Sequence, residues 1–177
     1  MPDENRPSFD IPRLAQVDQI LSDDLGFLGY STQKRNVAYL WQFLQFQRSL
    51  LDRYDIYGSV RKSMIRSIVL ITTNIIEYLL FMSVREKGRQ PGHALKQWIN
   101  QAASLGLIDD DLKEQLHRLR RLRSRIHPDA QTNELDYDSF DDHQVSDCVA
   151  HIATLRESLK EHFQPSGVLI EPSLPIS

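Results

Sequence analysis

The residues best suited to chemistry in this sequence lie close together between positions 116 and 128. The segment reads LHRLRRLRSRIHP and contains five arginines, followed by a histidine and a proline. On a helix that advances about 100° per residue, its leucines form one stripe of the kind that faces a core. Arg120, Arg123 and His127 lie along one edge of that stripe. Two guanidiniums and an imidazole placed in this way can hold a phosphate and transfer protons.

The other three arginines of the segment point elsewhere. Arg118, Arg121 and Arg125 lie roughly opposite the leucine stripe, and we expect them to face solvent without sharing a site. A structural interpretation also accounts for the whole segment. In it, the acidic residues 109–111 open a helix and the arginines close it, in agreement with the helix dipole, while Pro128 ends the helix. The spacing alone does not decide between these interpretations.

The segment resembles the closing motif of the HEPN superfamily. Those all-helical domains carry an Arg-x4-6-His motif, often written LR-x-LRN-x-IHP, and the resemblance covers about 25 residues, from Gly106 to Pro128. Arg120 and Arg121 fit the motif spacing to His127, with six and five intervening residues. Arg123 occupies the usual arginine slot but has three intervening residues before His127.

The resemblance implies a function as well as a fold. Catalytic HEPN proteins are metal-independent endoribonucleases, and others are non-catalytic dimeric modules in defence or toxin–antitoxin systems. Carried over, the resemblance makes His127 the general acid or base, with Arg120 and Arg123 holding the phosphate. Ser124 replaces the usual asparagine and would orient the hydroxyl or the imidazole. No metal or other cofactor is expected.

Composition places the chain among ordinary globular proteins. It has 177 residues, of which 41% are hydrophobic and 25% charged, with a formal net charge of −3. That charge excludes a general polyanion binder, so any contact with RNA requires a local basic patch. Cys148 is the only cysteine, which excludes an internal disulfide and a multi-cysteine metal site. The N-terminus does not have the pattern of a signal peptide, and we expect a cytoplasmic protein.

Hydrophobic periodicity predicts one all-α domain over residues 9–163, between a flexible N-terminus (1–8) and an extended C-terminal tail (164–177). The expected architecture is an up-and-down antiparallel bundle of about five or six helices. The expected helices span residues 9–25, 32–54, 59–87, 92–105, 109–126 and 139–163.

Glu77 is the most informative residue outside the arginine segment. It lies with Asn74 inside an apolar stretch, 67–84, that approaches the length of a membrane span. An ionisable group in mid-span is costly in lipid, so a buried helix surrounded by partners is favoured and no membrane contact is expected. A buried carboxylate needs a counter-ion, and Arg120 or Arg123 is the natural one. The resemblance adds that Glu77 and Asn74 support the site.

Three further patterns were weighed. The aromatic residues of the 32–54 helix suit a core or dimer interface better than a platform for stacking bases. Asp136 and Asp138 have the spacing of the first ligands in a calcium-binding loop. Phe140 stands where the third oxygen ligand belongs, so no calcium site is predicted. A third pattern, His143, Asp147 and His151, has a spacing compatible with metal ligation but lies opposite the apolar stripe of its helix, which favours a solvated face.

Two function hypotheses therefore stand. The first is a HEPN-like endoribonuclease or RNA-binding domain whose site lies in a homodimer cleft, with the twofold axis near Arg120 and His127. The second is a non-catalytic, dimeric interaction module, in which the arginines pair with Glu77 or with acidic residues of a partner protein.

Overall fold

The computed structural model describes residues 11, 13–17, 19, 26, 31–126 and 140–163. Within these ranges every regular element is helical and no strand occurs, so the predicted all-α class is confirmed. The expected segments 1–8 and 164–177 lie outside the described residues, as do most of the expected first helix and His127.

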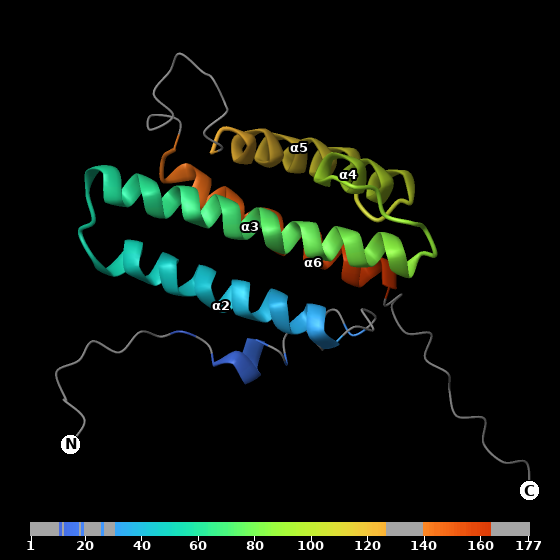
Figure 1. Cartoon of the computed structure of the whole chain (residues 1–177), viewed down its shortest axis with the longest axis horizontal. Helices are drawn as coiled ribbons and strands as arrows, with labels where there is room; N and C mark the ends of the chain where they lie inside the picture. The colour runs from blue at the N-terminus through green and yellow to red at the C-terminus, as the bar shows by residue number, and fades with distance from the viewer. Residues whose placement is uncertain are drawn as a thin grey trace, which may run out of the picture.

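Helices α2 to α6, whose full lengths lie within the described residues, form a bundle (Figure 1). Their bounds are α2 Ser31–Arg53, α3 Gly58–Glu86, α4 Leu95–Ser104, α5 Asp110–Ser124 and α6 His143–Phe163. Helices α2 and α5 run in one direction and α3 and α6 in the other, with α3 between α2 and the α4/α5 pair. This is the alternating arrangement expected of helices joined by short connections.

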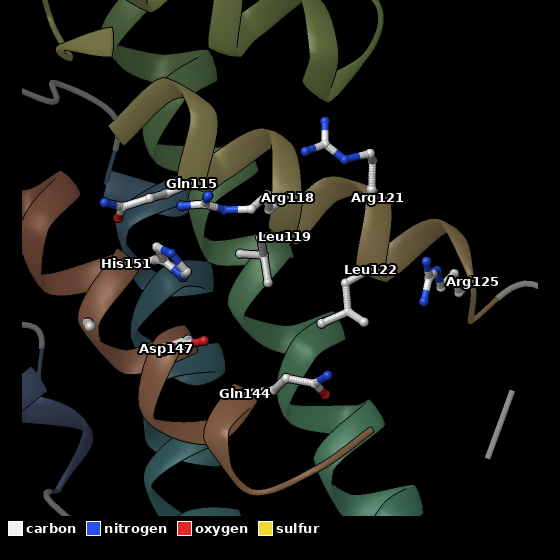
Figure 2. A pocket seen from close by; sticks show the side chains of 10 residues that line it. Gln115, Arg118, Leu119, Arg121, Leu122, Arg125, Gln144, Asp147 and His151 are labelled. Carbon is white, nitrogen blue, oxygen red and sulfur yellow. The ribbon is translucent and has the colours of Figure 1, made fainter. Parts of the chain in front are cut away.

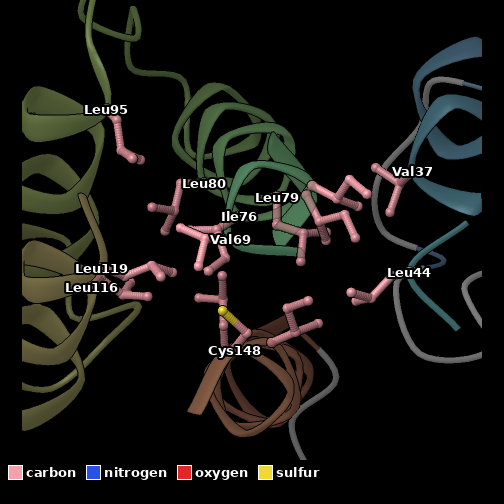
Figure 3. Packing of buried hydrophobic residues seen from close by; sticks show 14 of the residues in the cluster. Val37, Leu44, Val69, Ile76, Leu79, Leu80, Leu95, Leu116, Leu119 and Cys148 are labelled. Atoms are coloured by element: carbon pink, nitrogen blue, oxygen red, sulfur yellow. The ribbon is translucent and has the colours of Figure 1, made fainter. Parts of the chain in front are cut away.

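Helix α3 forms the centre of the bundle because its apolar residues face several neighbours at once. Thirteen of its residues are buried, and it packs against α2, α4, α5 and α6. Figure 3 shows Val69, Ile76 and Leu80 of α3 directed toward Leu119 of α5 and Cys148 of α6. By length and composition, α3 is also the one described helix that could cross a membrane, although 67% of its most apolar window is buried inside the protein.

The arginine helix α5 is delimited by local signals that the sequence already contains. Asp109 is the N-cap, and its carboxylate accepts a hydrogen bond of 2.7 Å from the backbone N–H of Leu112. Gly106 ends the preceding turn with φ of 71°, a left-handed conformation that favours glycine. The backbone N–H of Leu107 donates to the carbonyl of Ala102 (2.9 Å) in the same turn. These signals set where α5 starts relative to α4.

Helix α4 begins three residues later than its periodicity suggests, at Leu95 instead of residue 92. The reason is a compact turn around Gly92, whose N–H donates to Oε1 of Gln101 (3.0 Å). The indole N–H of Trp98 donates to the carbonyl of Gly92 (2.5 Å). This turn fixes the indole of Trp98 beside α3, where it meets Phe81 edge to face at 5.8 Å.

Side chains of α3 also hold the ends of α5 and α6. Arg66 donates to the carbonyl of Ile126 (3.3 Å), just past the last turn of α5, and its guanidinium lies 5.6 Å from the ring centre of Phe140. Arg61 forms an ion pair of 2.7 Å with Asp142, directly before α6. Helix α6 therefore begins at His143, four residues later than expected, and the orientation of α5 is set by α3.

Candidate functional site

Arg120 and Arg123 lie on the side of α5 that faces α3 and α4, as their position beside the leucine stripe predicts. Both are half-buried, whereas Leu116 and Leu119 of the stripe are buried. The two arginines line one cavity of about 260 Å³ together with Lys96 of α4. Three cationic side chains from two helices therefore share one small cavity.

The amino end of α4 adds to the positive character of this cavity. Ala94 is the N-cap of α4 and provides no side-chain hydrogen bond to the first backbone N–H groups. Ala94 and Leu95 both line the cavity. A helix N-terminus carries a partial positive charge and free N–H donors, which favour a bound anion. The cavity combines this helix end with the side chains of Lys96, Arg120 and Arg123.

Arg123 is held in place by Glu77 of α3. Nη1 of Arg123 donates to Oε1 of Glu77 in a hydrogen-bonded ion pair, in which the two side chains are 28% and 22% exposed. The expectation that Glu77 pairs with one of the edge arginines is confirmed, and the partner is Arg123. Arg120 makes no ion pair with a described residue, and its Nε is buried without a hydrogen-bond partner. The two edge arginines therefore differ, because one is neutralised and the other is not.

Glu77 also borders a second, more apolar cavity of about 420 Å³ on the same side of α3. Asn74 and Glu77 supply its polar wall. Tyr78, Phe81 and Trp98 supply its aromatic wall. Aromatic faces of this kind can stack a planar ring such as a nucleobase. The Glu77–Arg123 ion pair joins this cavity to the cationic one.

The remaining predicted residues give a mixed result. Ser124 is exposed and lines the cationic cavity, but its hydroxyl donates to the carbonyl of Arg121 (2.6 Å) within α5. It is therefore engaged with the backbone. His127 lies outside the described residues, directly after Ile126 in the sequence. Its role as an acid or base stays a prediction.

The sequence analysis missed a histidine on the same edge. His117 stands three residues before Arg120 and is 8% exposed, and its Nε2 lies 3.0 Å from Oδ1 of Asn100 on α4. Burial, followed by the nearby Arg120 cation, lowers the pKa of His117 below its usual 6.5. Its spacing of i, i+3 with Arg120 was a usable signal, because such pairs share a helix face.

Arg118, Arg121 and Arg125 are exposed, as predicted, and they line one groove although we expected them to share no site. They border an open groove between two helices, shown in Figure 2. The groove has a volume of about 630 Å³. Arg118 and Arg121 on α5 and Arg125 at its C-cap bound one side, and Gln144, Asp147 and His151 on α6 bound the other. We call it the α5/α6 groove. The sequence did not indicate this groove, because a helical wheel for α5 contains no information about the position of α6.

His151 is also less solvated than the pattern on α6 suggested. It is half-buried, and burial lowers its pKa below 6.5, with Asp147 opposing that shift and Arg118 adding to it. His143 and Asp147 are exposed. No group of three metal-ligating side chains is found among the described residues, so the spacing of these residues does not correspond to a metal site there.

The aromatic residues of α2 do not all enter the core. Trp41 packs against it, beneath the guanidinium of Arg156 at 5.1 Å, but Tyr39 and Phe43 remain 50% and 48% exposed. Tyr54, expected on the inner side of α2, is 41% exposed. An interface remains the better interpretation of the outward aromatics, since rings of this size are enriched at protein contacts.

Comparisons of this chain with family models, curated proteins and solved structures found no match.

Proposed function

We propose that this protein is a HEPN-like RNA-binding domain that acts as a metal-independent endoribonuclease, with its phosphate site on the edge of α5. The observation that carries the proposal is the cavity that Arg120 and Arg123 share with Lys96 at the amino end of α4. Guanidiniums bind phosphate oxygens in a two-pronged geometry, and helix N–H groups bind them as well. The cavity therefore suits a phosphodiester group better than an apolar ligand.

The aromatic cavity favours RNA over a simple anion. It adjoins the cationic cavity at the Glu77–Arg123 ion pair, and Tyr78, Phe81 and Trp98 provide flat apolar faces. Proteins that bind single-stranded nucleic acid combine a cationic track with aromatic residues that stack bases. A nucleotide placed across the two cavities would have its phosphate on Arg120 and its base against the aromatic wall.

In the proposed reaction the ribose 2′-hydroxyl attacks the adjacent phosphorus, and the bond from phosphorus to the 5′-oxygen breaks. The products are a 2′,3′-cyclic phosphate and a new 5′-hydroxyl end. His127 removes the proton from the attacking hydroxyl or supplies one to the leaving oxygen. Arg120 and Arg123 stabilise the negative charge that develops on the phosphate oxygens. For Arg123, binding the phosphate requires exchange of its bond to Glu77.

The second candidate function is a non-catalytic interaction module, and the Glu77–Arg123 ion pair favours it. A neutralised Arg123 and a Ser124 hydroxyl bonded to the backbone are what a structural role requires. In this alternative, Arg120 and Lys96 would contact acidic residues of a partner protein.

The decisive experiment measures cleavage of a single-stranded RNA by the purified protein in EDTA. We expect a cyclic-phosphate product with the wild type and loss of roughly two orders of magnitude or more in rate for His127→Ala and Arg120→Ala. Arg89→Ala serves as the matched control, because Arg89 is exposed and lies outside both cavities. RNA cleavage that is equal in all four proteins, or absent from the wild type, would reject the catalytic proposal and leave the interaction module.

A further inference from the structure

Among the described residues that line the α5/α6 groove, positive charges outnumber negative ones. Three arginines line it, against one acidic residue, Asp147. Arg118, Arg121 and Arg125 form no ion pair with any residue in the described part of the chain. An arginine keeps its charge at any physiological pH, so the groove is cationic although the whole chain has a net charge of −3.

The three arginines that line the groove repel one another along one side of the helix. Arg118 and Arg121 are three residues apart and Arg121 and Arg125 four, spacings at which like charges on a helix repel one another. The helix dipole compensates cations near the C-terminal end, but its effect is confined to about the last turn. Arg118 lies well before that turn, since α5 ends at Ser124. The helix dipole therefore accounts for Arg121 in the last turn of α5 and for Arg125 at its C-cap, but not for Arg118.

The groove also has the form of a binding surface. In Figure 2, Leu119 and Leu122 lie at its floor between the helices, and Arg118 and His151 lie toward one another above it. Nδ1 of His151 is buried without a hydrogen-bond partner. The groove thus offers guanidiniums, an imidazole and an apolar floor along one side of α5.

We propose that the α5/α6 groove binds the phosphodiester backbone of single-stranded RNA, as a second contact strip on the arginine helix. Arg118 and Arg125 are seven residues apart, or about 10.5 Å along the helix axis at 1.5 Å per residue. That distance is enough for more than one phosphate of a nucleic-acid strand. The apolar floor suits the face of a base or ribose. This inference rests on the proposed function in that both take RNA as the ligand, but it concerns a different side of α5.

The first test uses the single native cysteine, Cys148, which is buried and leaves the surface free of thiols in the described residues. Ala150→Cys places a thiol at an exposed position that borders the groove. Ala153→Cys is the matched control on α6, exposed but outside the groove. We expect a single-stranded oligouridylate to slow the reaction of the Ala150→Cys thiol with N-ethylmaleimide severalfold and to leave the control unchanged.

The same reaction separates RNA from other anions. Inorganic phosphate and polyglutamate are tested beside the oligouridylate at equal charge concentration. Protection by polyglutamate with none by oligouridylate would reject RNA and identify an acidic protein segment as the ligand. Protection by inorganic phosphate equal to that by oligouridylate would also reject the proposal, since an RNA strand must occupy the groove better than its isolated charge does.

The second test measures RNA affinity at several salt concentrations. We expect Arg118→Ala and Arg125→Ala each to weaken binding about tenfold and to lower the slope of log affinity against log salt by roughly 0.7, the value for one phosphate of a single strand. Arg35→Ala removes the same charge from an exposed position on α2 and should change neither quantity appreciably. Groove variants that behave like Arg35→Ala would overturn the proposal.

The two proposals fail in different ways. If RNA protects the Ala150→Cys thiol while wild-type protein cleaves no RNA, the groove stands and the catalytic function falls. If cleavage depends on His127 while the thiol is unprotected, the catalytic function stands and the groove falls. A wild-type protein that does not bind oligouridylate at all rejects both.

Discussion

Glu77 on α3 and Arg123 on α5 are 46 residues apart in the sequence and form a hydrogen-bonded ion pair between the two central helices. The pair stands where an apolar cavity with aromatic walls meets a cationic cavity. Its position gives it two effects. It fixes α5 against α3, and it occupies one of the two arginines that a phosphate would use.

Glu77→Gln tests both effects, because it keeps the size of the side chain and removes its charge. We expect the free energy of unfolding to fall by about 1 kcal/mol, since both partners remain partly exposed and solvent weakens such pairs. We also expect RNA affinity to rise severalfold, because Arg123 becomes free to bind phosphate. Denaturant unfolding and RNA titration measure the two quantities.

Glu86→Gln, the same change at an exposed position of α3, is the control. Equal RNA affinity in the two variants would mean that Arg123 does not contact RNA.

The stability of the fold should decrease as the pH falls below about 6.5. His117 and His151 both have a pKa lowered from 6.5, first of all by burial. Above 6.5 these imidazoles are neutral in both states and contribute no pH dependence. Below pH 6.5 these two histidines bind protons more readily in the unfolded chain than in the folded protein. The free energy of unfolding therefore falls by up to about 1.4 kcal/mol per pH unit for each histidine.

His151→Gln provides the check on this pH dependence. In urea unfolding between pH 8 and pH 5, the free energy of unfolding should decline less for the variant than for the wild type. The reason is that the variant lacks one of the two imidazoles with a lowered pKa. Parallel curves for the two proteins would show that His151 takes up protons equally well in the folded and unfolded chains.

Cys148 should be inert in the native protein. It is fully buried, and burial raises the pKa of its thiol to about 12, so almost no reactive thiolate exists at neutral pH. We expect its modification by a thiol reagent to follow the global unfolding rate and to accelerate sharply in denaturant. Mass spectrometry of the native protein after exposure to the reagent is the measurement. Rapid labelling without denaturant would show that α6 opens locally.

The sequence predicts those parts of the site that depend on one helix and on general physical chemistry. The leucine stripe of α5 places Arg120 and Arg123 toward the bundle, and the cost of a buried charge requires a partner for Glu77. Both expectations agree with the structure. The bounds of α5 were also readable, because Asp109 is an N-cap and Gly106 a turn residue.

The parts that escaped prediction depend on how helices meet. Lys96 joins the cationic cavity because α4 begins at Leu95 and packs against α5, and no periodicity within α4 indicates that contact. Similarly, the α5/α6 groove depends on how α5 and α6 pack, and side chains of α3 contact the residues next to both helices, Arg66 at Ile126 and Arg61 at Asp142. A helical wheel treats each helix alone and cannot reveal such sites.

The last prediction concerns the outward aromatics of α2, which we expect to form a homodimer interface. Tyr39 and Phe43 are one helical turn apart and about half exposed. Nε2 of Gln47 donates to the hydroxyl of Ser67 (2.8 Å), which sets the antiparallel register of α2 and α3. In that register Phe43, four residues before Gln47, lies about level with Ile71, four residues after Ser67.

An isologous contact across this face would repeat Tyr39 and Phe43 on both sides of the twofold axis. Phe43→Arg should therefore convert the dimer to a monomer, since it places a cation at the centre of an apolar contact. Light scattering reports the mass directly. Tyr57→Arg is the control, because Tyr57 is 73% exposed and precedes α3, away from the aromatics of α2. We expect Phe43→Arg to lose RNA cleavage together with the dimer while keeping its helical circular dichroism spectrum. A wild type that is already monomeric at micromolar concentration would reject a site formed by two chains. A monomeric Phe43→Arg variant with full cleavage activity would show that one chain suffices for catalysis.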